Sequence, residues 1–149
     1  MNIFIYTYDP APASYYKDGR KEYEKRLSRY CRIKHIACKN IKQLEKERAA
    51  LMSQTDSHKN LLVFVESGSV KSEVDSVALS KQIDEAAISG ISTLIFLIGF
   101  PEEDRDAFPG KHQLHSLSRM RMSLSLQSLI LEEQIYRAYR ILNREPYHK

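Results

Sequence analysis

The spacing of apolar residues differs from segment to segment along the chain, and this spacing predicts which segments form strands and which form helices. Residues 60–66 and 93–98 are continuous apolar runs, which indicate strands buried on both faces of a sheet. Residues 2–8 are rich in β-branched and aromatic side chains and predict the first strand. Residues 32–38 alternate less regularly and predict a second strand.

Apolar residues spaced three and four apart predict helices between these strands. The predicted helices cover residues 14–30, 41–52 and 76–89. Ser14 is the expected N-cap of the first helix. Gly90 is the expected residue after the end of the third, where a left-handed conformation commonly stops a helix.

The last third of the chain is less regular. Residues 102–110 predict a polar loop and residues 112–117 a short helix. Residues 119–126 lead into a last predicted strand, whose end falls within residues 124–129. One long helix follows and stops before Pro146, which cannot continue it. Its apolar positions recur at helical spacing: Leu129, Leu131, Ile135, Ala138, Tyr139 and Leu142.

This order of elements predicts an α/β domain with a mainly parallel sheet. Residues 1–149 form one domain, because the sequence contains no internal repeat, low-complexity tract or linker. A compact α/β domain without a second lobe often completes its site by dimerising. We therefore expect a homodimer whose interface contains the apolar face of the final helix: Ile135, Ala138, Tyr139 and Leu142.

Composition narrows the class of protein. Of the 149 residues, 42% are hydrophobic and 28% are charged, which is ordinary for a soluble globular protein. No apolar run is long enough to span a membrane. Cys31 and Cys38 form neither a disulfide framework nor a metal-ligand pattern, so we expect a cytoplasmic protein without a metal. The net charge of +4 permits binding to a polyanion and suits a merely soluble surface equally well.

Two C-terminal motifs carry a resemblance to a known family. Residues 133–138 read Glu-Gln-Ile-Tyr-Arg-Ala and residues 146–149 read Pro-Tyr-His-Lys, and together they resemble the signature end of the RlmH-type SPOUT-superfamily methyltransferases. Residues 22–27 and 97–99 are similar to that family's first helix and to the strand end before its cofactor loop. The resemblance covers nearly the whole chain.

The resemblance implies a SPOUT-like α/β fold with a C-terminal trefoil knot. It also implies that the protein uses S-adenosylmethionine to methylate N3 of a pseudouridine in large-subunit ribosomal RNA. The implied cofactor positions fall at three expected strand ends, where open parallel sheets bind ligands: Phe64, Gly99, Leu124, Ser125, Leu126, Gln127, Ser128 and Leu129.

The tail carries the implied RNA-binding positions: Arg137, Arg144, Tyr147, His148 and Lys149. An aromatic ring beside cations is suited to holding an unstacked base. His148 is also the candidate catalytic base, since methylation at N3 requires removal of the proton there. The alternative for His148 is a surface histidine without a catalytic role.

Departures from the family pattern leave other functions open. Phe100 and Glu103 stand where the family has glycines, and their side chains can occupy space that a ligand needs. A Pro-His-containing family segment has no evident counterpart between Leu129 and Ile130. These departures predict weak or absent cofactor binding. The alternatives are a non-catalytic RNA- or ribosome-binding homologue and, with less support from the intact tail, a structural dimer module.

Overall fold

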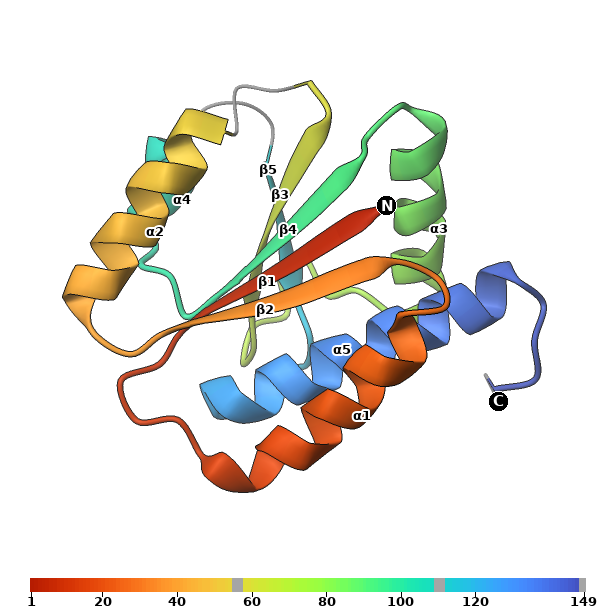
Figure 1. Ribbon diagram of the computed structural model, residues 1–149, viewed down its shortest axis with the longest axis horizontal. Helices are drawn as coiled ribbons and strands as arrows, with labels where there is room; N and C mark the ends of the chain where they lie inside the picture. The colour runs from red at the N-terminus through yellow and green to blue at the C-terminus, as the bar shows by residue number, and fades with distance from the viewer. Residues whose placement is uncertain (55–57, 109–111, 148–149) are drawn as a thin grey trace.

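A five-stranded sheet lies between two layers of helices (Figure 1) in the computed structural model, which describes residues 1–54, 58–108 and 112–147. The strand order is β2-β1-β4-β3-β5, and every neighbouring pair is parallel. The expected α/β fold with a mainly parallel sheet is confirmed. The strands are β1 (Asn2–Tyr8), β2 (Arg32–Cys38), β3 (Asn60–Glu66), β4 (Thr93–Ile98) and β5 (His112–Ser116).

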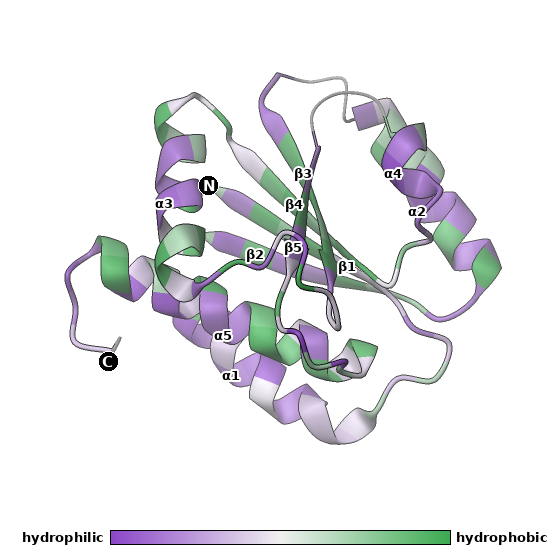
Figure 2. Cartoon of the chain, turned by 180° about the vertical axis from the view of Figure 1, so that it is seen from behind, coloured by the Kyte–Doolittle hydropathy of each residue, from purple (hydrophilic) through white to green (hydrophobic). Residues whose placement is uncertain are grey.

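Helices cover both faces of the sheet, as Figure 1 and Figure 2 show from opposite sides. They are the 3-10 turn η1 (Ser14–Tyr16) and the α-helices α1 (Lys17–Leu27), α2 (Ile41–Gln54), α3 (Ser76–Ile88), α4 (Asp104–Ala107) and α5 (Leu124–Leu142). The helices α1, α3 and α5 pack on one face, and α2 and α4 pack on the other. None of the described helices is long and apolar enough to cross a membrane.

Alternate residues of the central strands enter two separate cores, which explains why these strands are apolar throughout. On the first face, Ile5, Val63 and Phe96 meet Leu131 and Ile135 of α5. On the second face, the core contains Leu44 and Leu51 of α2 together with strand and loop residues: Tyr6, Leu62, Phe64, Ile95, Leu97, Phe100 and Phe108.

Two predictions for the last third of the chain are wrong. Residues 112–117 do not form a helix, because β5 pairs with β3 from Leu62↔His112 to Glu66↔Ser116. The last strand is therefore β5, and α5 already begins at Leu124. Ser123 caps this helix, since its hydroxyl accepts a hydrogen bond from the amide of Leu126 at 3.3 Å. Residues 124–129 are thus the first turns of a helix.

The other helix boundaries agree more closely with prediction. The first helix is a 3-10 turn followed by α1, which ends at Leu27, and Ser14 provides no side-chain cap. The second helix extends to Gln54, two residues beyond the prediction. Gly90 follows α3 with φ of 88°, as expected for its position. The predicted polar loop contains the single turn α4.

The apolar face of α5 is covered within the chain itself. Ile135 and Ala138 are fully buried and Tyr139 is 9% exposed, because α5 lies under the sheet between α1 and α3. Of the four residues expected in a dimer interface, only Leu142 remains half-buried. A dimer interface therefore cannot rest on Ile135, Ala138 and Tyr139.

A polar cluster interrupts the core between α1, α5 and the sheet. Arg20 Nη1 donates to His35 Nδ1 at 2.5 Å, so His35 Nε2 carries the ring proton and donates to Thr7 Oγ1 at 2.9 Å. The Thr7 hydroxyl lies 2.9 Å from Ser128 Oγ. One turn further along α5, Glu132 is fully buried, and neither carboxylate oxygen has a hydrogen-bond partner among the described residues.

Candidate cofactor site

The segment after β5, residues 117–123, lies against the end of β3. The amide of Leu117 donates to the carbonyl of Glu66 at 2.9 Å, and the amide of Gly68 donates to the carbonyl of Ser118 at 2.8 Å. The amide of Met122 donates to Ser67 Oγ at 2.9 Å. These bonds fix the segment beside the carboxyl ends of the strands, where ligands of parallel sheets bind.

Gly99 ends β4 in the same region and leaves no room for a side chain. Its φ of 77° is in the left-handed region. A Cβ atom there would lie 2.4 Å from the carbonyl oxygen of Tyr8 and 3.1 Å from Leu124 Cδ1. The glycine therefore lets the β4 end, the β1 end and the start of α5 come together.

These segments line a cavity of about 280 Å³ that is open to solvent. Its lining residues come from the end of β3, the end of β4, the turn α4, residues 117–123 and the start of α5: Val65, Glu66, Ser67, Gly99, Phe100, Arg105, Arg121, Met122, Leu124 and Gln127. The lining combines aliphatic side chains with a carboxylate, two guanidinium groups and an amide, so it suits a ligand with both apolar and polar parts.

Gln127, one of the lining residues, has a buried acceptor without a partner in the described part of the chain. Its amide nitrogen donates to the carbonyl of Met122 at 3.0 Å and to Ser67 Oγ at 3.2 Å. Its Oε1 is buried without a hydrogen-bond partner among the described residues. A buried acceptor in this state costs about 1–3 kcal/mol unless a donor is supplied, and a bound ligand with an N–H group supplies one.

The two residues that depart from the family pattern, Phe100 and Glu103, lie in different surroundings. Phe100 is 9% exposed and packs in the core beneath α2, so it forms one wall of the cavity. Glu103 is exposed and does not line the cavity. The carboxylate that does line it, Glu66, is paired with Arg105 at 2.9 Å.

The structure separates the positions expected to bind the cofactor. Gly99, Leu124 and Gln127 line the cavity, whereas the ring of Phe64 packs against Phe108 in the α2 and α4 core. The remaining four positions do not line the cavity. The Ser125 hydroxyl donates to Asp9 and accepts from the amide of Ala13, and the Ser128 hydroxyl is hydrogen-bonded to Thr7. Leu129 packs on Gly19, and Leu126 is half-buried.

Sequence reasoning missed the segment 117–123. The available signal was Ser123, a preferred N-cap residue directly before a stretch with helical period. With the helix starting there, the last strand ends at Ser116 and not within residues 124–129. The junction of Leu129 and Ile130, where a segment seemed to be missing, lies within α5.

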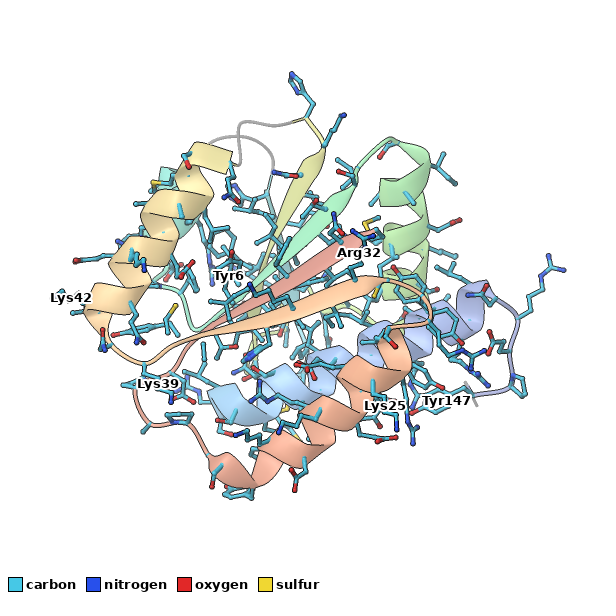
Figure 3. The ribbon with its side chains drawn as sticks, viewed as in Figure 1. Tyr6, Lys25, Arg32, Lys39, Lys42 and Tyr147 are labelled. Carbon is cyan, nitrogen blue, oxygen red and sulfur yellow. The ribbon has the colours of Figure 1, made fainter. Side chains whose placement is uncertain are left out.

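The predicted RNA-binding tail returns to α5. The centre of the Tyr147 ring lies 5.0 Å from the centre of the Tyr136 ring. The guanidinium of Arg137 lies 4.9 Å from the centre of the Tyr147 ring. Its hydroxyl donates to Glu133 Oε1 at 3.1 Å, and burial raises the pKa of Tyr147 well above its usual value. Figure 3 shows Tyr147 beside the layer of α1 and α5.

The remaining tail positions differ in their surroundings. Arg137 is also paired with Glu133 at 2.7 Å, whereas Arg144 is exposed with φ of 55°. His148 and Lys149 lie outside the described residues. Glu133 and Arg137 follow Gln127 by six and ten residues, so Tyr147 contacts α5 about 9–15 Å along its axis from the cavity.

The described residues contain neither a metal-binding group nor an exposed thiol. Among residues 1–54, 58–108 and 112–147, no three His, Cys, Asp or Glu side chains form a group that could hold a metal ion. Cys31 and Cys38 are both buried free thiols. Burial raises the pKa of Cys31 to about 11, which keeps the thiol protonated and unreactive near neutral pH.

Comparison with known proteins gives full-length matches. A family profile described as "Predicted SPOUT methyltransferase" matches residues 1–148. "Ribosomal RNA large subunit methyltransferase H 1" of Thermoanaerobacter sp. (strain X514) is 38% identical over 149 residues, the whole of both chains. "Ribosomal RNA large subunit methyltransferase H" of Clostridioides difficile (strain 630) is 34% identical over 162 aligned positions, again covering all of both chains.

The first of these alignments bears on the family segment that has no counterpart between Leu129 and Ile130. The Thermoanaerobacter relative aligns over 149 positions with all 149 residues of this chain, so it has no extra segment between Leu129 and Ile130. The profile match and the full-length identities agree with the parallel α/β fold. The chain belongs to the SPOUT methyltransferase family.

Proposed function

We propose that this protein uses S-adenosylmethionine to methylate large-subunit ribosomal RNA. The observation that carries the proposal is the cavity at the ends of β3, β4 and β5, which combines the close approach at Gly99 with the unsatisfied Oε1 of Gln127. Membership of the SPOUT methyltransferase family and relatives named for methylation of that RNA support it.

The cavity residues fit the cofactor. S-adenosylmethionine, when bound, supplies an electrophilic methyl group on a sulfonium centre. Val65, Met122 and Leu124 would cover its apolar parts, and Gln127 Oε1 would accept a hydrogen bond from one of its N–H groups. Backbone groups at Gly99 and along residues 117–122 would hold its polar edges. We therefore assign the third cofactor segment to residues 117–122, followed by Leu124 and Gln127.

The chain's own part in the reaction is to hold the RNA base and remove its proton. N3 of a pseudouridine is the assignment implied by the resemblance, and His148 is the candidate base. Arg137, Arg144, Tyr147 and Lys149 are the candidate RNA contacts. Since Tyr147 lies along α5 from the cavity, we propose a homodimer in which the tail of one copy serves the cavity of the other.

The trefoil knot and a cytoplasmic location of the protein are part of the same proposal. The start of α5 lies among segments distant in sequence, as the bonds of Ser125 with Asp9 and Ala13 and the contact of Leu124 with Gly99 indicate. Such insertion supports the trefoil knot that the resemblance implies. The buried free thiols Cys31 and Cys38 suit the reducing cytoplasm.

Calorimetric titration with S-adenosylmethionine tests the proposal directly. We expect binding with one cofactor per chain, and transfer of a labelled methyl group to isolated large ribosomal subunits, with the modified nucleotide identified by mass spectrometry. A non-catalytic RNA-binding homologue would instead bind the ribosomal particles without binding the cofactor. That result would refute the proposed activity and would favour the alternative function.

A further inference from the structure

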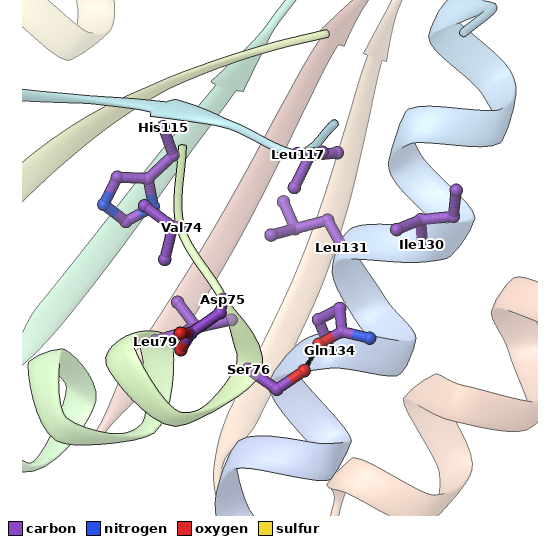
Figure 4. A pocket seen from close by; sticks show the side chains of 9 residues that line it. All are labelled: Val74, Asp75, Ser76, Leu79, His115, Leu117, Ile130, Leu131 and Gln134. Atoms are coloured by element: carbon purple, nitrogen blue, oxygen red, sulfur yellow. Dashed lines mark hydrogen bonds between the residues drawn. The ribbon is translucent and has the colours of Figure 1, made fainter. Parts of the chain in front are cut away.

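A second cavity, of about 260 Å³, opens between β5, α3 and α5 (Figure 4). Five of its lining side chains are aliphatic: Val74, Leu79, Leu117, Ile130 and Leu131. Four are polar: Asp75, Ser76, His115 and Gln134. Apolar walls with a few polar groups are typical of sites that take small organic ligands, and this volume is suited to a single ring system.

His115 is the group that points to a ligand. Its side chain is 4% exposed, and it makes no hydrogen bond or ion pair within the described residues. Burial lowers the pKa of His115 to about 4, so the imidazole is neutral at pH 7 and offers one donor and one acceptor. Its ring nitrogens are not among the fully buried polar atoms that lack a partner, so they keep accessible surface, and a ligand in the cavity that His115 lines can pair with them.

The other polar groups limit the charge of that ligand. Asp75 Oδ1 caps α3 by accepting from the amide of Ala78 at 2.7 Å, and its carboxylate offsets the attraction that a helix N-terminus has for anions. Ser76 donates to Gln134 at 2.6 Å, drawn as a dashed line in Figure 4. The site therefore favours an uncharged ring with N–H donors and disfavours a phosphate.

The cavity lies close to the proposed cofactor site. Leu117 belongs to the segment 117–123, whose far end lines the first cavity. Along α5, the residues lining the two cavities are centred about six residues apart, or about 9 Å. A nucleotide near the target in the same RNA strand can span such a distance.

We propose that the cavity between β5, α3 and α5 binds an unstacked base of the RNA substrate, with His115 and Asp75 on its hydrogen-bonding edge and Leu117 and Ile130 against its faces. This role rests on the proposed function, since it places a base next to the one that is methylated. Proteins recognise single-stranded RNA by hydrogen-bonding the edges of its splayed-out bases, and apolar side chains can hold the faces of an extruded base.

Titration of the whole protein with adenosine, cytidine, guanosine and uridine tests the site, with the His115 imidazole followed by NMR. We expect at least one nucleoside to shift the ring signals, and inorganic phosphate to leave them unchanged. His115→Leu should weaken nucleoside affinity about fivefold, since one hydrogen bond is worth about 1 kcal/mol. His112→Leu, on the opposite face of β5, is the matched control and should bind as the original chain does.

A second variant provides an independent test in case His115→Leu does not fold. Ile130 is half-buried, and Ile130→Trp should fill the cavity and abolish nucleoside binding while circular dichroism stays unchanged. Absence of a shift with all four nucleosides, or an equal shift with phosphate, would overturn the proposal. A His115 signal that depends on protein concentration alone would assign the cavity to a second copy and would also overturn it.

The cofactor titration separates this inference from the proposed function. If the protein binds S-adenosylmethionine but no nucleoside shifts the His115 signals, the proposed activity stands and the proposed base pocket is refuted. In methyl transfer, His115→Leu should raise KM for RNA and leave kcat unchanged, because the pocket holds the substrate away from the reacting atoms. Loss of kcat at unchanged KM would contradict a positioning role.

Discussion

Gly99 and Gly90 share a left-handed backbone conformation but have different surroundings. Their φ angles are 77° and 88°. A Cβ atom at Gly99 would lie 2.4 Å from a backbone oxygen, whereas a Cβ atom at Gly90 would meet nothing within 4 Å. Comparing a substitution at Gly90 with one at Gly99 therefore separates the conformational cost of a side chain from its steric cost.

Gly90→Ala should lower the free energy of unfolding by about 1–2 kcal/mol, the cost of the left-handed conformation alone. Gly99→Ala should cost at least about 1 kcal/mol more, because either β1 or β4 must shift. It should also abolish S-adenosylmethionine binding, since that shift deforms the cavity. Urea denaturation and calorimetry measure both effects, and equal stability of the two variants would contradict the steric argument.

Glu132 is a carboxyl group that folding keeps protonated. Burial, reinforced by Glu24 of α1 and opposed by Arg20, raises the pKa of Glu132 to about 8 from 4.5. The folded chain thus binds one more proton than the unfolded chain between pH 4.5 and 8, and stability from this group falls as the pH rises through that window. His35 and His115, with pKa values lowered to about 4 by burial, act oppositely below pH 6.5.

Comparison of the original chain with Glu132→Gln isolates the contribution of this carboxyl group. Because Gln stays neutral, the variant should gain stability relative to the original as the pH rises from 4.5 to 9, by about 2–4 kcal/mol. Urea denaturation across this range checks the slope. Glu45→Gln, at an exposed position of α2, is the control and should show no such gain.

At the scale of elements, the start of α5 determines the shape of the cofactor cavity. Ser123→Ala should lower the free energy of unfolding by about 1 kcal/mol through loss of the cap. It should also weaken cofactor binding, because Leu124 and Gln127 lie in the first turn. Ser14→Ala is the control, since Ser14 makes no cap, and thermal unfolding should be unchanged.

The sequence identifies β1, β2, β3 and β4 correctly, and the clearest of these strands have a single possible environment. Residues 60–66 and 93–98 are apolar throughout because both faces are buried, and flanking polar or glycine residues mark their ends. The strand β5 is harder to identify. It is a short edge strand that contains two histidines and a glutamine, so its pattern lacks both the apolar run and the alternation that indicate strands.

The start of α5 misleads for a different reason. The order Ser-Leu-Ser-Leu at 123–126 imitates the two-residue period of a strand. The helical face that is actually buried contains Gln127 and Ser128, two polar residues that hide the helical period. Their burial depends on partners far along the chain, such as Thr7 and Ser67, and one sequence does not reveal such pairs.

At the scale of the whole molecule, the tail is part of the folded structure. Tyr147→Ala should lower the free energy of unfolding by about 1–2 kcal/mol, because it removes the contact with Tyr136 and the cation–π contact with Arg137. Tyr147→Phe keeps the ring and should cost under about 1 kcal/mol. Urea denaturation ranks the variants, and an Ala variant as stable as the original would contradict the packing described here.

The proposed dimer is tested by mass in solution. Light scattering at micromolar concentration should give twice 17.3 kDa. If the tail of one copy serves the cavity of the other, a mixture of Gly99→Ala chains and tail-truncated chains should recover part of the activity that each lacks alone. A monomeric mass with full activity would refute the dimer proposal.

The contacts of α5 also determine the order of events in folding. Thr7 of the central strand β1 meets Ser128, 121 residues later, and the amide of Ala13 meets Ser125, 112 residues later. Contacts between such distant residues slow folding, because long loops must close before the contacts form. During synthesis, the sheet face that α5 covers stays uncovered until residues 124–142 leave the ribosome. A nascent chain of this protein therefore presents an apolar surface to chaperones after its strands are made and before α5 is complete.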